Sequence, residues 1–431
     1  MITLFKNAKI LKLENEKGFM CGNVVVENDI ITYVGEKEPT IQVDQVIDVC
    51  GNILMPGFVN THAHTAMTIL RGIKDDATLQ NWLYDNIIPC ENQLTDEDVY
   101  WGEMLGIAEY ARCGITTMEE NYFNIEGITK AINKSGIRAR IGIEAKVCTD
   151  SDYNCYEDFK KQYKIVKQNT NSNLVKVSCF AHAIYSTSEE KFFDILRFAK
   201  ENDLPLGIHL AETLKEVGDC TQEHNGLTPA GYLESLGYLD RQCLCAHCVH
   251  MDKDDLQILA DYGVSISTCP SSNIKLASGI APVFAMQNKG INVTIGTDGV
   301  ASNNSLDMFK EMFLVATLSK VSLYDPTVVP ASDVLKMATI NGAKALGINS
   351  GEIKVGKNAD LILVKITEPH MQPEVNLLSN LVYSAKGSDV YFTMVGGKVL
   401  YNDGEYNIGE NINEIYKNVN KIRERITKKR I

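Results

Sequence analysis

The stretch FVNTHAHTAMTILRG (residues 58–72) holds two of the eight histidines of the chain, His62 and His64, with one alanine between them. It continues the apolar run ILMPGFV (residues 53–59), so residues 57–64 are predicted to form a short strand. Side chains on a strand return to the same face every second residue, which places these two imidazoles on one side, about 7 Å apart. They can bind one cation together, and the alternative is two unrelated histidines at a strand end.

The pattern of an apolar strand followed by a helical segment recurs from about residue 55 to residue 345. Helical segments such as residues 96–113, 188–202 and 252–263 separate the strands. Eight such strands are typical of a closed parallel (β/α)8 barrel, a TIM-like fold of the α/β class. An open doubly wound sheet is the alternative, but its Gly-x-Gly-x-x-Gly turn is missing. The expected strands are residues 57–64, 114–121, 139–146, 175–183, 205–212, 243–250, 264–273 and 292–299.

The two ends of the chain differ from this pattern, because residues 1–54 and 351–405 contain short strands joined by turns. Chain termini often lie close together, so both ends are expected to pair in one small β-sandwich. We therefore predict part of a β-sandwich in residues 1–54, a metal-dependent hydrolase barrel in 55–350, and in 351–431 the rest of the sandwich plus a C-terminal helix. Apolar residues at helical spacing predict that this helix is docked by one face: Ile412, Ile415, Val419, Ile422 and Ile426.

The composition restricts the class of protein. A formal net charge of −13 argues against a nucleic-acid or anionic-membrane partner. The first residues lack the apolar core of a signal peptide, and no apolar run approaches the length of a membrane helix. Most of the twelve cysteines lie in apolar runs, which favours reduced thiols and a cytoplasmic location. The pair Cys245 and Cys248 has no second Cys-x-x-Cys partner for a structural zinc, and it ends a strand instead of opening a helix.

Candidate catalytic side chains lie where the predicted strands end, which is where barrel enzymes carry their active sites. Five strands bring histidine or aspartate to this rim, and Glu212 follows three residues after one of them. Of the other histidines, His224 and His370 are expected in exposed loops and His250 in a structural role. The candidates at the rim are His62, His64, His182, His209, His247 and Asp298.

Three imidazoles and one carboxylate suit Zn²⁺, with Fe²⁺ as the second choice. We predict the ligands His62, His64, His209 and Asp298 and an open position for water, whose pKa Zn²⁺ lowers to about 7. A second metal would need a bridging ligand, often a modified lysine at the end of the strand at residues 175–183. That end carries His182, and Lys176 lies about 20 Å earlier along the strand, so a single metal is expected.

Three residues have predicted roles in proton transfer and orientation. Asp298 can contact the metal and orient the water, and His247 is placed to hydrogen-bond the attacking oxygen. Glu212 can shuttle a proton from the water to a ring nitrogen or a leaving amine. The His-x-Glu with Pro-Cys-x-x-Cys signature of cytidine-type deaminases and the His-Glu-x-x-His motif are both missing.

Four stretches resemble the methylthioadenosine/S-adenosylhomocysteine deaminase family of the amidohydrolase superfamily: residues 54–83, 246–283, 296–312 and 356–364. The resemblance implies a TIM-like barrel, the four metal ligands named above, and hydrolytic release of ammonia from C6 of an adenine ring. It also implies that Glu91 binds the ribose hydroxyls, that His182, Glu212 and Asp298 contact the substrate, and that Trp82 covers the site. The family often has an arginine just beyond the third strand, where this chain has Glu144 and Lys146.

Several alternatives stay open at this point. A guanine, pterin or chlorotriazine hydrolase of the same superfamily is one, although Glu91 and the stretch LQNWL (residues 79–83) favour an adenosine derivative. A non-catalytic scaffold is another, but it is expected to have lost its ligands. The sequence does not rank adenosine, 5′-methylthioadenosine and S-adenosylhomocysteine, and it allows a homo-oligomer.

Overall fold

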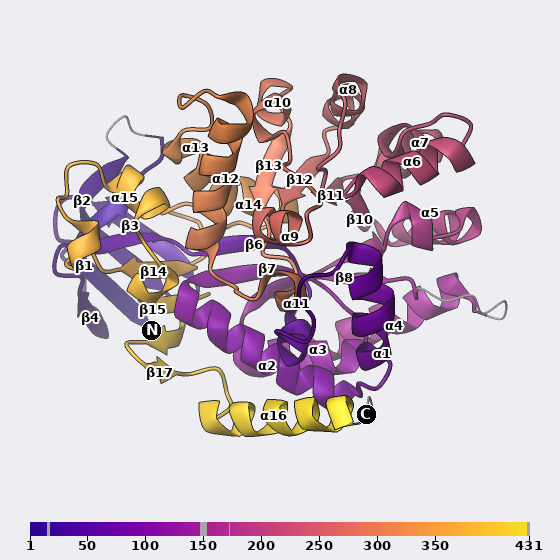
Figure 1. Cartoon of the computed structure of the whole chain (residues 1–431). Helices are drawn as coiled ribbons and strands as arrows, with labels where there is room; N and C mark the ends of the chain where they lie inside the picture. The colour runs from indigo at the N-terminus through magenta and orange to yellow at the C-terminus, as the bar shows by residue number, and fades with distance from the viewer. Residues whose placement is uncertain (15–17, 147–152, 172, 429–431) are drawn as a thin grey trace.

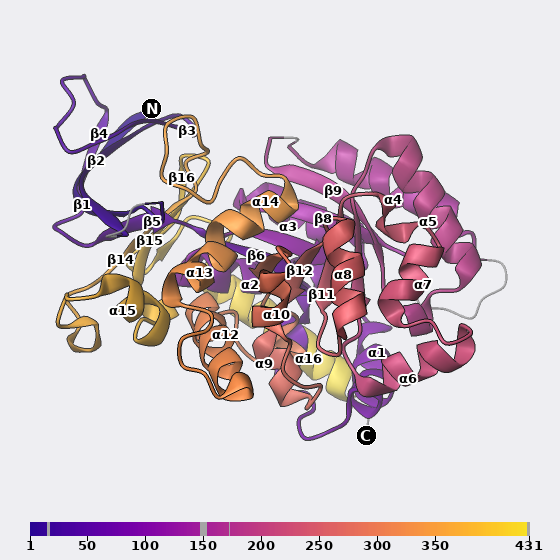
Figure 2. The same ribbon diagram turned by 90° about the horizontal axis from the view of Figure 1, so that it is seen from above.

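The computed structural model describes residues 1–14, 18–146, 153–171 and 173–428 and contains a nearly closed barrel of eight parallel strands (Figures 1 and 2). Each strand pairs with the next one along the chain. The first and last strands also meet, because the Thr61 hydroxyl lies 2.7 Å from that of Thr294 and accepts or donates a hydrogen bond there. The predicted (β/α)8 class is confirmed. The strands are β6 (Phe58–Ala63), β7 (Ile115–Asn121), β8 (Arg138–Glu144), β9 (Val175–Ala181), β10 (Leu206–Leu210), β11 (Cys243–His247), β12 (Ser265–Thr268) and β13 (Asn292–Ile295).

The barrel strands are buried on both faces, as their apolar sequences predict, because helices cover the outside (Figure 2). The three helices expected from periodicity are α2 (Asp96–Cys113), α5 (Glu189–Asn202) and α8 (Lys253–Asp261). α2 begins with a capping box formed by Thr95 and Asp98, and it ends at Gly114, whose φ of 83° suits glycine.

The two ends of the chain form one mixed sheet of nine strands beside the barrel (Figure 1). The central strand β5 pairs in parallel with β1 and antiparallel with β14, so it joins the N-terminal strands to the C-terminal ones. The sheet bends around its own apolar core: the rings of Phe5 on β1 and Phe392 on β15 lie 5.7 Å apart although two strands separate them. The division into domains at residues 54 and 350 stays a prediction. The strands are β1 (Ile2–Leu11), β2 (Phe19–Glu27), β3 (Ile30–Gly35), β4 (Gln45–Asp48), β5 (Ile53–Pro56), β14 (Leu361–Val364), β15 (Val390–Val395), β16 (Lys398–Asn402) and β17 (Glu405–Tyr406).

The C-terminal helix α16 (Ile412–Lys428) packs against α2 and against the short helix η1 (Thr65–Leu70), which follows His64 (Figure 1). Four residues of the predicted apolar stripe are buried, and Ile412 at the start of the helix is half-buried. Arg423 donates a hydrogen bond to the carbonyl of Ile69. Over the described ranges, the structure has no helix both long enough and apolar enough to span a bilayer.

A buried ion pair connects the barrel to the mixed sheet. Arg138 at the start of β8 donates from Nε to Asp360 Oδ2 at 2.7 Å and from Nη2 to Oδ1 at 3.0 Å. Ser350 and the backbone N–H of Gly396 also donate to Asp360. Both ion-pair side chains are less than a tenth exposed. A charge that loses its partner in such a place cannot be solvated, which makes this pair a critical contact between the two sheets.

Replacing Asp360 by asparagine is therefore expected to lower the free energy of unfolding by about 3–5 kcal/mol. The matched control is Asp403→Asn, because Asp403 forms an exposed pair with Lys365 and is expected to contribute less than about 1 kcal/mol. Urea denaturation followed by fluorescence measures both. Equal midpoints for the two variants would contradict the assigned importance of the buried pair.

Candidate active site

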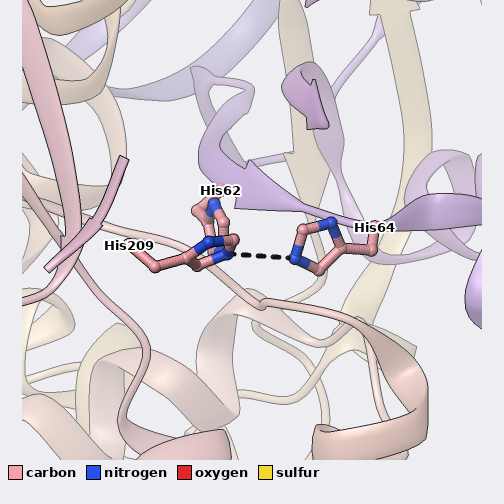
Figure 3. Close-up of side chains that lie close together, drawn as sticks. All are labelled: His62, His64 and His209. Carbon is pink, nitrogen blue, oxygen red and sulfur yellow. Dashed lines mark hydrogen bonds between the residues drawn. The ribbon is translucent and has the colours of Figure 1, made fainter. Parts of the chain in front are cut away.

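Histidines from two strands converge at the C-terminal end of the barrel. His62 and His64 come from the end of β6, and His209 comes from β10 (Figure 3). The Nε2 atom of His209 lies 3.1 Å from Nε2 of His62 and 3.3 Å from Nε2 of His64. Asp298 follows β13 and places Oδ1 3.5 Å from His64 Nε2 and 3.7 Å from His62 Nε2. The four side chains named from the sequence thus lie together.

The hydrogen bonds of these imidazoles fix which nitrogen carries the proton. The Nδ1–H of His64 donates to the carbonyl of Asn121, and that of His209 donates to the carbonyl of His182 at 2.6 Å. The Nε2 atoms of both rings therefore face the centre of the cluster, where they can bind a metal. Burial lowers the pKa values of His62 and His209 well below 6.5, which keeps these rings neutral.

The geometry of the cluster fits a divalent metal. Nitrogen ligands at 2.0–2.1 Å from a tetrahedral ion lie about 3.3–3.4 Å apart, close to the spacings found here. Converging lone pairs repel one another unless a cation lies between them. Burial opposes ionisation of Asp298, but the neighbouring His247, His62 and His64 lower its pKa to about 2, so it supplies a negative charge. A further triad of possible ligands consists of His62, His247 and Asp298. It shares His62 and Asp298 with the four side chains described above, so His247 belongs to the same site.

The backbone at this rim has unusual conformations. Asp298 and His247 have φ values of 59° and 69°, which non-glycine residues seldom adopt and which often mark functional sites. At Gly296 a Cβ atom would lie 2.8 Å from Cβ of His62. Glycine is therefore required for β13 to approach β6 and bring Asp298 beside the histidines.

Glu212 and His247 lie side by side next to this cluster. Glu212 Oε2 is 3.8 Å from His247 Nε2, and Ser278 donates a hydrogen bond of 3.0 Å to Glu212 Oε1. Glu216 accepts the backbone N–H groups of Ala211 and Glu212 and so fixes the turn that carries Glu212. Burial opposes the charge on His247, but the carboxylates of Glu212 and Asp298 raise its pKa above 6.5. An acid and a base are thus paired at the edge of the cluster.

A cavity of about 680 Å³ opens onto these residues and has the size expected for a small-molecule site. Glu91, at the end of α1 (Ile88–Glu91), lines it and accepts a hydrogen bond of 2.7 Å from the Tyr122 hydroxyl. Trp82, in η2 (Asn81–Ile87), lines it too and is 6% exposed; its Nε1–H has no partner among the described residues. His182 also faces the cavity, and burial lowers its pKa to about 4. All the substrate contacts expected from the sequence therefore line one cavity.

Strand β7 supports the cluster, a contribution that the sequence reasoning missed. Glu120 accepts the backbone N–H of Thr65, the residue after His64, at 3.0 Å. The next residue, Asn121, supplies the carbonyl that holds the His64 ring. Burial raises the pKa of Glu120 to about 8 and that of the adjacent Glu103 well above 4.5. Two successive glutamates in the apolar stretch GITTMEEN were the available signal, since buried acids need a specific partner.

Other residues singled out in the sequence lie elsewhere. His224 stacks on Tyr232, and His370 forms a hydrogen bond with Asp389. Because a neighbour covers each ring, both histidines are partly buried. The expectation that they lie exposed in loops was therefore wrong. His250 has a structural role, as expected, because its Nε2–H donates a hydrogen bond of 2.7 Å to the backbone carbonyl of Ser278. Lys146 lines the cavity and is exposed. All eleven cysteines in the described ranges are free thiols.

Comparisons with known proteins agree with this geometry. The model of the amidohydrolase family matches residues 53–400. A 5-methylthioadenosine/S-adenosylhomocysteine deaminase of Thermoanaerobacter pseudethanolicus is 41% identical over 410 residues, which cover 94% of this chain and 95% of that protein. A 5′-deoxyadenosine deaminase of Methanothermobacter thermautotrophicus is 40% identical and covers 91% of this chain and 92% of its own. The crystal structure of an adenosine deaminase from Xanthomonas campestris with bound zinc has a TM-score of 0.93 and 32% identity, covering 99% of this chain and 98% of that one.

Proposed function

This chain belongs to the amidohydrolase family, and we propose that it is a metal-dependent deaminase of adenosine derivatives. In this reaction water replaces the 6-amino group of the adenine ring, and the products are the corresponding inosine derivative and ammonia. The chain is accordingly a hydrolase of C–N bonds. Two relatives are about 40% identical over more than nine-tenths of the chain, and their names describe deaminases of adenine nucleosides.

One observation carries the proposal. The ring nitrogens of His62, His64 and His209 converge, and His64 and His209 line the same cavity as the acid–base pair Glu212 and His247. The same cavity is also lined by Glu91, a buried carboxylate suited to accept hydrogen bonds from two hydroxyl groups. The combination supports a substrate that has an amino-substituted ring at one end, where hydrolysis occurs, and a diol at the other.

Each residue has a defined task in the proposed reaction. A bound divalent ion would be held by His62, His64, His209 and Asp298, and it would act as a Lewis acid that makes water acidic near neutral pH. Glu212 accepts a proton from the attacking water and delivers it to the purine ring nitrogen beside C6. His247 donates a hydrogen bond to the incoming oxygen. Glu212 then carries the remaining proton of the C6 hydroxyl to the amino group, the C6–N bond breaks, and ammonia leaves as the C6 carbonyl forms.

Substrate positioning falls to residues farther from the cluster. Glu91 accepts the ribose hydroxyl hydrogens, and the Tyr122 hydroxyl holds its carboxylate in place. Trp82 covers the site, and His182 contacts the base as a neutral ring. The direct test is the ultraviolet change from adenine to hypoxanthine, measured with adenosine, 5′-methylthioadenosine and S-adenosylhomocysteine. No change with any of the three would overturn the proposal.

The preferred ion and the cellular location are part of the same proposal. Three imidazoles and one carboxylate favour Zn²⁺, with Fe²⁺ as the alternative, and one ion per chain is proposed. Free thiols at every described cysteine suit the reducing cytoplasm. The partner is a small nucleoside, and the net charge of −13 does not favour nucleic acid.

The pH dependence of substrate capture is expected to follow Glu91. Burial raises the pKa of this carboxyl to about 7, although the Tyr122 hydrogen bond lowers it. Because the ionised form accepts both ribose hydroxyls, kcat/KM should fall as the pH drops through about 7. Tyr122→Phe removes the stabilising hydrogen bond, so this acidic limb should move to higher pH. The kcat/KM profile with 5′-methylthioadenosine measures it, and an unmoved limb would contradict the role of Glu91.

A further inference from the structure

Glu144, the last residue of β8, lines the cavity and lies on a strand that carries none of the proposed metal ligands. Its backbone is clamped by Gln162 of α4 (Cys155–Asn169), which donates from Nε2 to the Glu144 carbonyl at 2.9 Å and accepts from its N–H at 3.2 Å. Residues of the described ranges donate no hydrogen bond to the Glu144 carboxylate and form no ion pair with it. A fixed backbone therefore presents an uncompensated acid to the cavity.

The surroundings of Glu144 are predominantly negative. Burial, followed by repulsion from Glu91 and Glu120, raises the pKa of Glu144 to about 8. Lys146 and Lys161 also line the cavity, but both are exposed, where the solvent screens their charges. A positive group bound beside Glu144 would relieve the repulsion between the two carboxylates, and a negative group would add to it.

The order of residues along the cavity indicates which part of the substrate meets Glu144. If C6 of adenine lies at the histidine cluster and the ribose hydroxyls at Glu91, the remaining space is available to the 5′ substituent. Tyr122, whose hydroxyl holds Glu91, directly follows β7, and β8 pairs with β7 through Asn121 and Gly142, so Glu144 borders the ribose end of the cavity. This step rests on the proposed function.

We propose that Glu144 is a specificity-determining residue that selects adenosine derivatives by the charge of their 5′ substituent. It favours a positively charged substituent, admits a neutral one and disfavours a negatively charged one. Because the selection comes from one carboxylate, it should disappear when that charge is removed without change of shape.

The test compares three nucleosides that share the adenosine head. They are 5′-methylthioadenosine, its S-methyl sulfonium derivative, which is a permanent cation, and 5′-(carboxymethylthio)adenosine, which is an anion. Deamination is assayed at pH 8.5, above the pKa of Glu144, in the unsubstituted protein and in Glu144→Gln. The matched control is Glu126→Gln, which removes a carboxylate from an exposed position on the cavity wall.

The readout is kcat/KM for each charged nucleoside divided by that for the neutral one. In Glu144→Gln the ratio should fall about tenfold for the cation and rise about tenfold for the anion, while Glu126→Gln changes each ratio less than about twofold. Unchanged ratios in Glu144→Gln, or equal changes in both variants, would overturn the inference and leave the proposed function intact. Failure of the unsubstituted protein to deaminate any of the three would overturn both.

Discussion

Glu212→Gln is expected to lower kcat for deamination by at least about 10³-fold, because glutamine cannot accept a proton from water or deliver one to the ring. The substitution keeps the shape and the hydrogen-bonding capacity toward Ser278, and Glu212 is not among the proposed metal ligands. Metal content should therefore stay equal to that of the unsubstituted protein. Stopped assays of ammonia release and elemental analysis of the same preparation measure the two quantities.

A matched control separates this effect from a general loss of carboxylate charge. Glu223 lies on the exposed face of α6 (Leu214–Glu223), near in sequence but outside the cavity wall. Glu223→Gln should retain normal turnover. Loss of metal in Glu212→Gln would assign Glu212 to the metal site, and normal turnover in that variant would remove it from the reaction.

Removal of the divalent ion is expected to abolish activity and to weaken the fold. Without a cation, the lone pairs of His64 and His209 face one another in a buried cluster. A ligand present at a thousand times its dissociation constant stabilises the folded state by about 4 kcal/mol, so dialysis against a chelator should lower the Tm. Stoichiometric Zn²⁺ should restore both activity and Tm.

Side-chain substitution tests the same site without a chelator. His209→Ala should leave the protein with little bound metal, because it removes the nitrogen nearest to both His62 and His64. His224→Ala is the control, since that partly buried imidazole only stacks on Tyr232. Full activity after exhaustive metal removal, or normal metal content in His209→Ala, would contradict the assignment.

Much of the fold could be predicted because the barrel repeats one local pattern. The helix expected at residues 96–113 has those bounds in the structure, where Thr95 caps its start and Gly114 ends it. Each candidate metal ligand lies at or just after a strand end, so strand alternation and barrel topology together brought His62, His209 and Asp298 to one rim. For this part of the site, local sequence was enough when combined with the rule that all strands of a parallel barrel end at the same rim.

Contacts between residues far apart in the sequence could not be predicted in the same way. The support of the His64 ring depends on a backbone carbonyl, that of Asn121, and carbonyl positions have no sequence signal. The acid pair Glu103 and Glu120 meets only after α2 packs beside β7. The left-handed conformation of Asp298 is imposed by the turn after β13 and not by the residue type. These features come from tertiary packing.

The pairing of β5 with β14 has a consequence for biosynthesis. Met55 and Ile362 are register partners, so the N-terminal strands leave the ribosome about 300 residues before their C-terminal neighbours, which at 5–20 residues per second is a delay of about 15–60 s. During that interval the nascent chain carries an apolar edge that nothing yet covers. We expect ribosome-bound chains arrested before residue 361 to recruit chaperones at this edge and chains released after residue 406 to lose that dependence.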